Sequence, residues 1–298
     1  METTQDNEIK CLDDGYVRLV DYMPRIAPEG RTIEFAIVQS ARVSYGLGLK
    51  SEKEDRALIR YLMRNRHTSP FETVKFKFHI RAPKFVSIQL ERHRTANINE
   101  LSQRYSEIKE SFYHPSVIGK DQCPGGGIRL ASDTNKQGSD LTISDTQVNE
   151  LRSTFESIES KLSDIFSEYK KLLELGVSKE VARFCLPIST YTELYYTMDL
   201  HNLMHFLSLR MDSHAQPEIQ VYAKAMYQLI KPLVPTVMEC FDTFTLNAMT
   251  LSKDEVEAII AHSPCNINNP REKKEFIEKY KKLGLDRDIP RNPSLNQL

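Results

Sequence analysis

The chain of 298 residues has no tryptophan and few cysteines and glycines. The shortage of cysteine and glycine argues against several classes of protein. Its five cysteines are scattered and form no C-x-x-C pair, which disfavours a disulfide scaffold and a structural zinc finger. With 11 Gly and 14 Pro, the composition is neither collagen-like nor of low complexity. Because 40% of the residues are hydrophobic and 27% are charged, we expect a globular protein of one large or two small domains.

An excess of one charge and a long apolar run are also missing. The 40 basic and 41 acidic residues give a net charge of -1, which argues against a protein that coats nucleic acid. No stretch approaches the ~20 apolar residues of a membrane-spanning helix. Residues 1–10 are polar and carry no apolar or arginine-rich leader. We therefore expect a soluble, intracellular, cytoplasmic protein without nucleic-acid or membrane partners.

The first half of the chain carries patterns typical of both a helix and a strand. Ser51 and Glu54 form a capping box ahead of an apolar face that ends near Asn65, which predicts a helix. Residues 74–81 alternate between apolar and polar side chains, which predicts a half-buried strand. The apolar run at 85–91 is too short to separate helix from strand.

The second half of the chain is mostly helical in pattern. Apolar residues at spacings of three and four predict a long helix that begins at Ser144 and ends at Gly176. The glycines 125–127 lie in a polar stretch without a preceding strand, so we interpret them as a mobile loop rather than a phosphate-binding loop. Further helices are expected at residues 178–183, 194–209 and 271–283, and residues 220–249 are expected to be mostly helical with interruptions at Pro232 and Pro235.

The densest collection of chemical groups is an arginine-rich segment at residues 91–105. Arg92, Arg94 and Arg104 can hold phosphate oxygens in bidentate geometry. Neighbouring Asn, Ser and Gln side chains add neutral groups of the kind that orient a base or a sugar. A solvated basic loop or helix face is the evenly weighted alternative on composition alone.

A second polar cluster follows on a predicted helix and its exit. His201 and His205 share a helix face and, with Asp212 or His214, could supply three metal ligands. The glutamate that follows the first histidine in zinc-hydrolase motifs is missing, so we favour polar contacts and expect no metal. Arg210 is more informative, because such a guanidinium usually faces an anion or a developing negative charge.

Nucleophilic chemistry has little support. Ser102 lacks a G-x-S-x-G elbow, which favours a hydrogen-bonding serine. Cys185 lies in an apolar stretch, which favours a buried and inert thiol. The sequence has no G-x-G-x-x-G or Walker loop, so a dinucleotide would not be bound by a Rossmann turn.

The segment Arg92–Tyr105 reads R-H-R-x-x-N-x-N-E-x-S-x-R-Y and resembles the signature of the flavin-dependent thymidylate synthases, R-H-R-x-x-S-x-N-E-x-S-x-R-Y. The resemblance covers roughly residues 11–113 and 144–250. It implies an α+β fold with a mixed sheet surrounded by helices, in a homotetramer whose active sites draw on several subunits. The other segments that resemble the family, in the same order, are Asp14–Asp21, Ala41–Ser44, His67–Glu72, Glu180–Arg183 and Leu209–Gln216.

The resemblance implies an FAD enzyme that makes dTMP from dUMP, with the methylene from 5,10-methylenetetrahydrofolate and the hydride from NADPH by way of FAD. It implies a single catalytic domain over residues 1–250, with a loop insertion at about 114–143, and a charged C-terminal extension over 251–298. No enzyme cysteine attacks the uracil in this family, in agreement with an inert Cys185. A non-catalytic nucleotide-binding protein is the alternative.

Site residues are also implied, position by position. The counterpart of Arg210 is the catalytic residue and faces the uracil ring, where it favours the ionised base. Residues matching dUMP-binding positions are Gln89, Leu90, Glu91, Arg92, Glu100, Leu101, Ser102, Gln103, Arg104, Arg183 and Arg210. Residues matching FAD-binding positions are Ser69, Arg92, His93, Arg94, Glu100, Asp199, Leu200, His201 and His205. His67 and Gln216 are expected to contact these ligand-binding residues rather than the ligands themselves.

Three positions depart from the family. Asn97 replaces the usual serine of the signature, and both side chains form hydrogen bonds. Asp199 and His201 stand where some relatives carry Asn and Arg. The change at His201 removes a permanent positive charge near the expected flavin.

Overall fold

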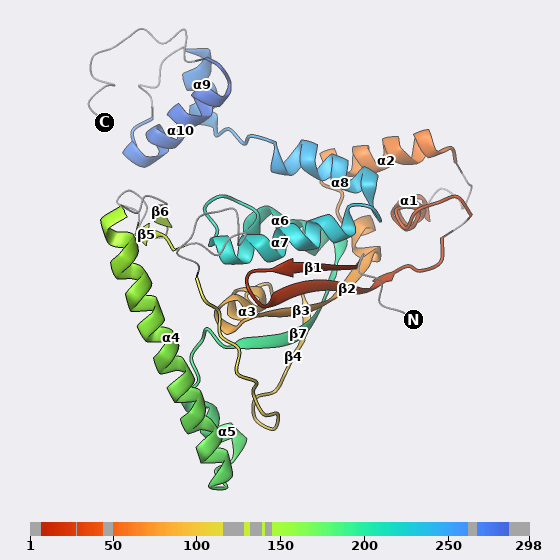
Figure 1. The fold of residues 1–298 in the computed structure, drawn as a ribbon. Coiled ribbons are helices and arrows are strands. Elements are labelled where there is room, and N and C mark those ends of the chain that lie inside the picture. Colours follow the sequence, from red (N-terminus) through yellow and green to blue (C-terminus); the bar gives the residue numbers. More distant parts are fainter. Residues whose placement is uncertain are drawn as a thin grey trace. The chain divides into compact units, whose positions relative to one another are not determined.

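The computed structural model describes residues 7–27, 29–43, 50–115, 128–131, 139–140, 145–261 and 267–285. The chain divides into two compact units, 1–241 and 242–298. Unit 1–241 contains a five-stranded sheet and its flanking helices (Figure 1). Its strands are β1 (Glu8–Cys11), β2 (Gly15–Met23), β3 (Lys75–Pro83), β4 (Asn97–Glu100) and β7 (Tyr191–Asp199).

The strand order of this sheet is β1-β2-β3-β7-β4, and every pairing is antiparallel. The expected α+β class is confirmed, whereas the expectation of a mixed sheet is wrong. Alternation of apolar and polar residues shows which face of a strand is buried, but it carries no information on the direction of the neighbouring strand. A second pair, β5 (Leu130–Ala131) with β6 (Ser139–Asp140), is also antiparallel.

The predicted strand at 74–81 is confirmed as β3. Phe76, Phe78 and Ile80 are fully buried, while Lys75 and Lys77 on the opposite face are exposed. Three helices pack against the sheet: α3 (Lys84–Glu91), α6 (Leu200–Arg210) and α7 (Pro217–Ile230). The ambiguous segment at 85–91 is therefore helical.

The prediction of a helix over residues 194–209 is wrong for its first part, which belongs to strand β7, and is confirmed for its second part, which is α6. Leu194, Tyr196 and Met198 are buried and alternate with more exposed residues, which is the period of a strand. The helix begins only after Asp199, whose carboxylate accepts a hydrogen bond from the Asn202 amide at 2.9 Å. This N-cap marks the true helix start.

Two further helix predictions are confirmed. Helix α2 (Glu52–Arg64) begins with the expected capping box of Ser51 and Glu54. Helix α4 (Asp145–Glu174) ends two residues before Gly176, which has a φ of +84°. The expected cap at Ser144 and the glycines 125–127 lie outside the described residues.

Helix α4 carries the short helix α5 (Lys179–Ala182) at one end (Figure 1). A 3-10 turn, Arg183–Cys185, follows it. Phe166 and Tyr169 of α4 pack with Ile108 and Phe112 in a separate apolar cluster.

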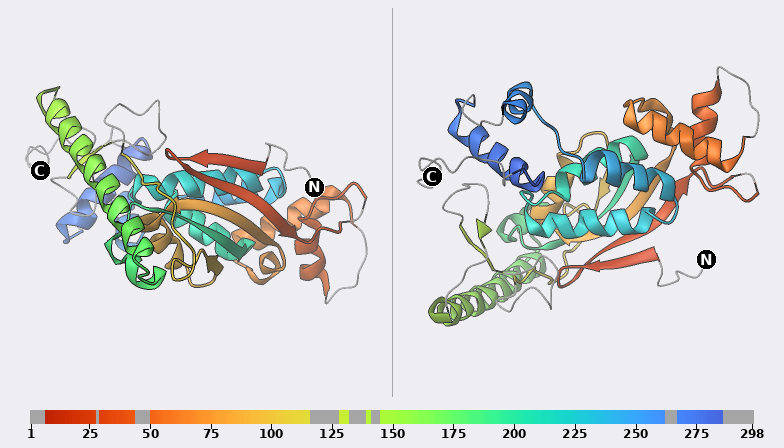
Figure 2. Two further views of the ribbon diagram at one scale, coloured as in Figure 1. Left: turned by 60° about the horizontal axis from the view of Figure 1, so that its bottom comes forward. Right: turned by 90° about the horizontal axis from the view of Figure 1, so that it is seen from above.

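The β1–β2 hairpin was not predicted from the sequence. Figures 1 and 2 show it in red at one edge of the sheet, with α7 packed on it. At Gly15, a Cβ atom would lie 2.1 Å from the Tyr222 hydroxyl of α7 and 2.6 Å from the Cys11 carbonyl oxygen. Tyr222 also donates a hydrogen bond to the Arg81 carbonyl at 3.0 Å. Glycine at position 15 thus permits close contact between hairpin, helix and β3.

The remaining helices of unit 1–241 are α1 (Phe35–Arg42) and α8 (Pro235–Phe241), and a 3-10 helix spans Ser69–Thr73. Unit 242–298 begins with a π-helical turn and contains α9 (Lys253–Ile260) and α10 (Pro270–Lys282). Helix α10 confirms the helix predicted at 271–283. Its Phe276 and Tyr280 pack with Ala258 and Ile267 in a small core of this unit.

Candidate functional site

The arginine-rich segment runs from the end of α3 into the edge strand β4. Asn97 pairs with Thr197 and Glu100 pairs with Leu194 of β7, so residues 97–100 of the segment form a strand, while Arg92, Arg94 and Arg104 lie in the turns on either side of it. The amide of His93 donates to the Leu90 carbonyl and that of Ala96 to the His93 carbonyl, which forms the arginine-rich turn, residues 92–96, between α3 and β4.

Arg210 and His93 come together although they lie 117 residues apart. The Arg210 Nε donates a hydrogen bond to the His93 Nε2 at 3.0 Å, and the His93 ring meets Phe206 edge-on at 4.8 Å. Burial, with the nearby charges of Arg210 and His205, lowers the pKa of His93 to about 4. His93 is therefore a neutral acceptor near pH 7, with its proton on Nδ1.

The half-buried Arg210 guanidinium has no carboxylate partner among the residues that the structure describes. Its charge is therefore available to an anionic group. The Gln89 Nε2 of α3 donates to the Gln216 Oε1 at 2.6 Å, which links α3 to the N-terminus of α7.

Arg92 and Arg94 are exposed on the turn, and within the described ranges neither pairs with a carboxylate. Glu100, in contrast, is fixed: Lys84 donates to its Oε2 at 2.7 Å, and Ser87 lies 3.3 Å from its Oε1. The sequence interpretation did not include Lys84 or Ser87, because a lysine after a proline at a helix start carries no distinctive signal.

Five of the residues expected at the flavin lie on α6 or beside it: Asp199, Leu200, His201, His205 and Ser69. The 3-10 helix that begins at Ser69 packs against α6, and the Leu200 amide donates to the Val74 carbonyl at 2.8 Å. The carboxylate of Asp199 caps α6, which is a structural role that the sequence interpretation did not assign. His201 is half-buried and His205 is exposed.

Two leucines, Leu90 and Leu200, were expected at the dUMP site and the FAD site respectively. The side chains of Leu90 and Leu200 are fully buried in the core, so only their main chains can meet a ligand. Arg104 pairs with Glu180 of α5 at 2.8 Å, and Arg183 follows on the adjoining 3-10 turn. Figure 1 shows α5, which Arg183 follows, apart from α6, the helix that ends at Arg210.

The remaining residues expected to bind dUMP directly follow β4. Leu101 is exposed, and its amide donates to the Glu193 carbonyl at 2.8 Å, while Ser102 and Gln103 are half-buried. Cys185 is half-buried rather than buried, and its thiol lies 3.3 Å from the Ala182 carbonyl.

In the described part of the chain, no three His, Cys, Asp or Glu side chains form a metal-binding group. There, too, no helix has the length and apolarity to cross a membrane.

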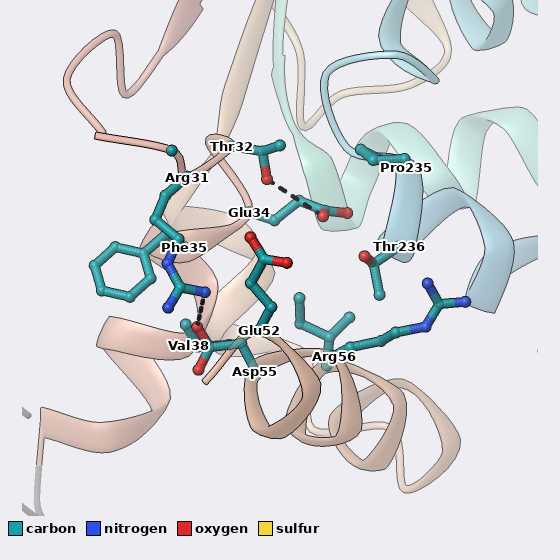
Figure 3. A pocket seen from close by; sticks show the side chains of 12 residues that line it. Arg31, Thr32, Glu34, Phe35, Val38, Glu52, Asp55, Arg56, Pro235 and Thr236 are labelled. Carbon is teal, nitrogen blue, oxygen red and sulfur yellow. Dashed lines mark hydrogen bonds and ion pairs between the residues drawn. The ribbon is translucent and has the colours of Figure 1, made fainter. Parts of the chain in front are cut away.

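A separate cavity of about 220 Å³ lies between α1, α2 and the start of α8 (Figure 3). None of the residues expected to bind dUMP or FAD lines it. Glu34 points into this cavity, and its carboxylate accepts from the Val237 amide at 2.7 Å. It thereby satisfies an amide of the first turn of α8. Burial raises the pKa of Glu34 above its ordinary value of 4.5.

We expect Glu34→Ala to lower the free energy of unfolding by about 1–3 kcal/mol, because the buried Val237 amide loses its acceptor. Glu34→Gln keeps an acceptor and is expected to be milder. Since the folded-state pKa is raised, the wild-type carboxyl favours folding below pH 4.5, and this contribution disappears as the pH rises through the folded-state pKa. The stability of Glu34→Gln relative to wild type should therefore rise with pH.

Urea denaturation at several pH values measures both effects. Glu52→Gln, in the same cavity but exposed, is the matched control and should change stability by less than about 1 kcal/mol. Equal stability of Glu34→Ala and wild type would show that this capping contact contributes nothing.

Comparison with known proteins gives consistent results. Residues 18–236 match the family described as Thymidylate synthase complementing protein (Thy1). A protein of Dictyostelium discoideum named flavin-dependent thymidylate synthase is 47% identical over 276 residues, covering 93% of this chain and 87% of that protein. The protein of the same name from Treponema denticola is 46% identical over 281 residues, covering 93% and 98%.

A solved structure is similar as well. The crystal structure of the UMP/dUMP methylase PolB from Streptomyces cacaoi, bound with 5-Br dUMP, superimposes with a TM-score of 0.65 and 35% sequence identity. The match covers 80% of this chain and 99% of that one.

Proposed function

Because the chain belongs to the flavin-dependent thymidylate synthase family and is an enzyme, we propose that it converts dUMP to dTMP by reductive methylation. The carbon donor is 5,10-methylenetetrahydrofolate and NADPH is the reductant. The observation that carries the proposal is the meeting of Arg210, His93 and the arginine-rich turn in one place. The similarity to a structure bound with 5-Br dUMP supports the choice of nucleotide.

The arginine-rich turn supplies the groups for the anionic parts of two ligands. Arg92 and Arg94 are exposed and without carboxylate partners in the described ranges, so they fit phosphate oxygens. FAD, when bound, carries the reducing hydride; Ser69, His93, Asp199, His201 and His205 complete its site around α6. This set of hydroxyl, imidazole and guanidinium groups suits a pyrophosphate and a polar ring system.

Arg210 acts on the uracil ring in this proposal. Its guanidinium stabilises the negative charge that the ring acquires when the base ionises. His93 holds the Nε of Arg210 and, being neutral, takes none of its charge away. Gln89 and Gln216 position the ring edge through amide groups. Cys185, on the remote 3-10 turn, takes no part in the chemistry.

We further propose that the enzyme is a homotetramer with shared sites. Helix α5, which Arg183 follows, lies apart from α6, which ends at Arg210, and a second subunit would allow one nucleotide to contact both arginines (Figure 1). Beside Arg183, Val181, Phe184 and Ile188 are 56%, 78% and 63% exposed. Apolar side chains gathered in this way are typical of a protein interface.

A spectrum and an isotope-release assay test the proposed function. We expect the purified protein to show the visible absorption bands of bound flavin. We also expect tritium release from C5-labelled dUMP only when both methylenetetrahydrofolate and NADPH are present. Protein that carries no flavin, binds none on addition and releases no tritium would refute the proposal.

A further inference from the structure

Lys84, the first residue of α3, connects the last residue of α3 to the last residue of β4, on the two sides of the arginine-rich turn. Its Nζ donates to the Glu91 Oε1 at 3.0 Å and to the Glu100 Oε2 at 2.7 Å. Burial opposes its charge, yet the two carboxylates raise the pKa of Lys84 above its ordinary value. The ammonium therefore remains charged between Glu91, which precedes the turn, and Glu100, which ends β4.

The start of α3, which carries Lys84, is held in place by a backbone hydrogen bond and by buried side chains. Lys84 continues directly from β3, and its amide donates to the Thr190 carbonyl at 2.9 Å. Val86 and Leu90 anchor the same helix in the core. One turn further on, the fully buried Ser87 lies 3.3 Å from the second oxygen of Glu100. Both carboxylate oxygens of Glu100 thus meet α3.

The charges of the turn give this contact a consequence for binding. Glu91 and Glu100 are the carboxylates nearest in sequence to Arg92 and Arg94, whose guanidiniums pair with no carboxylate in the described part of the chain. If the two carboxylates lost the ammonium between them, they would become partners for those arginines. An arginine paired with a neighbouring carboxylate competes with phosphate for its own donors.

We propose that Lys84 is a positioning residue that holds Glu91 and Glu100 together and so keeps Arg92 and Arg94 open to the anionic groups of dUMP and FAD. The inference rests on the proposed function, because it assigns those anions to the turn. Lys84 itself touches neither ligand; it acts through the two glutamates.

Lys84→Met tests the inference, because methionine keeps an apolar stem and removes the ammonium. Titrations of the full-length protein with dUMP and FAD give the two dissociation constants. We expect both to rise by about tenfold in Lys84→Met. Lys84→Arg, which keeps the charge, should bind both ligands within about threefold of wild type.

Lys279→Met is the matched control. Lys279 has the same side-chain exposure as Lys84, 31%, and bonds both oxygens of Glu255 at 2.8 and 3.0 Å, but it lies in unit 242–298. We expect it to leave both dissociation constants unchanged. A thermal melt of each variant separates a loss of stability from a loss of binding.

The possible outcomes are distinct. Wild-type affinities in Lys84→Met, with or without a lower melting temperature, would overturn the inference and leave only a structural ion pair. An equal loss in Lys84→Arg would also overturn it, because charge would then not be the cause. Failure of wild-type protein to bind dUMP and FAD would instead refute the proposed function, and this inference with it.

Discussion

Arg210→Ala is expected to lower kcat by about 10²- to 10³-fold while leaving the fold intact. The guanidinium is half-buried, oriented by His93 and unpaired with any carboxylate in the described residues, so its charge is available to an ionising base. Removal of one preorganised donor for a developing negative charge costs about this much in other enzymes. Steady-state kinetics of tritium release, with a thermal melt of the variant, measure both parts.

Two control variants show whether the effect depends on the charge of Arg210 alone or also on the planar shape of its guanidinium. Arg210→Lys keeps the charge but not the planar donor that meets His93, so we expect it to recover only part of the rate. Arg152→Ala removes an exposed arginine of α4 and should retain wild-type kcat. A folded Arg210→Ala enzyme with wild-type kcat would remove Arg210 from the chemistry.

Gly15→Ala is expected to destabilise unit 1–241 by about 3 kcal/mol or more, or to prevent its folding. The added Cβ would lie 2.1 Å from the Tyr222 hydroxyl and 2.6 and 2.8 Å from the carbonyl oxygens of Cys11 and Arg81. A side chain can rotate away, but two strand carbonyls cannot move without breaking the sheet. Chemical denaturation and soluble yield are the measurements.

Tyr222→Phe tests which contact decides the effect. If the hydroxyl alone were responsible, the double variant Gly15→Ala/Tyr222→Phe would regain the stability of Tyr222→Phe. We expect no such recovery, because the carbonyls of Cys11 and Arg81 remain. Stability of Gly15→Ala within about 0.5 kcal/mol of wild type would show that the hairpin adjusts freely.

Local signals determined which parts of the fold could be predicted. The capping box at Ser51 and the glycine at 176 mark helix ends through contacts within a few residues, and both helices were predicted. The hairpin was missed because β1 is short and β2 has a register shift between Leu19 and Asp21, which interrupts its alternation. Strand β7 was taken for helix because its alternation merges into the apolar pattern of α6.

The candidate site, too, could be predicted only in part. The residue types in the arginine-rich turn were recognisable from the sequence, because a phosphate-binding segment needs exposed guanidiniums close together. The meeting of Arg210 with His93, and of Lys84 with Glu100, depends on packing of α6 and α3 that no spacing reveals. The roles of these residues toward dUMP and FAD remain predictions.

The central strand pair has a consequence for synthesis of the protein. His79 in β3 pairs with Tyr195 in β7, so at about 5–20 residues per second the partner strand leaves the ribosome roughly 6–23 s later. Until then Phe76 and Phe78 belong to a strand with one unprotected edge. A nascent chain halted before Tyr191 would expose that edge permanently, which makes such fragments substrates for chaperones and prone to aggregate.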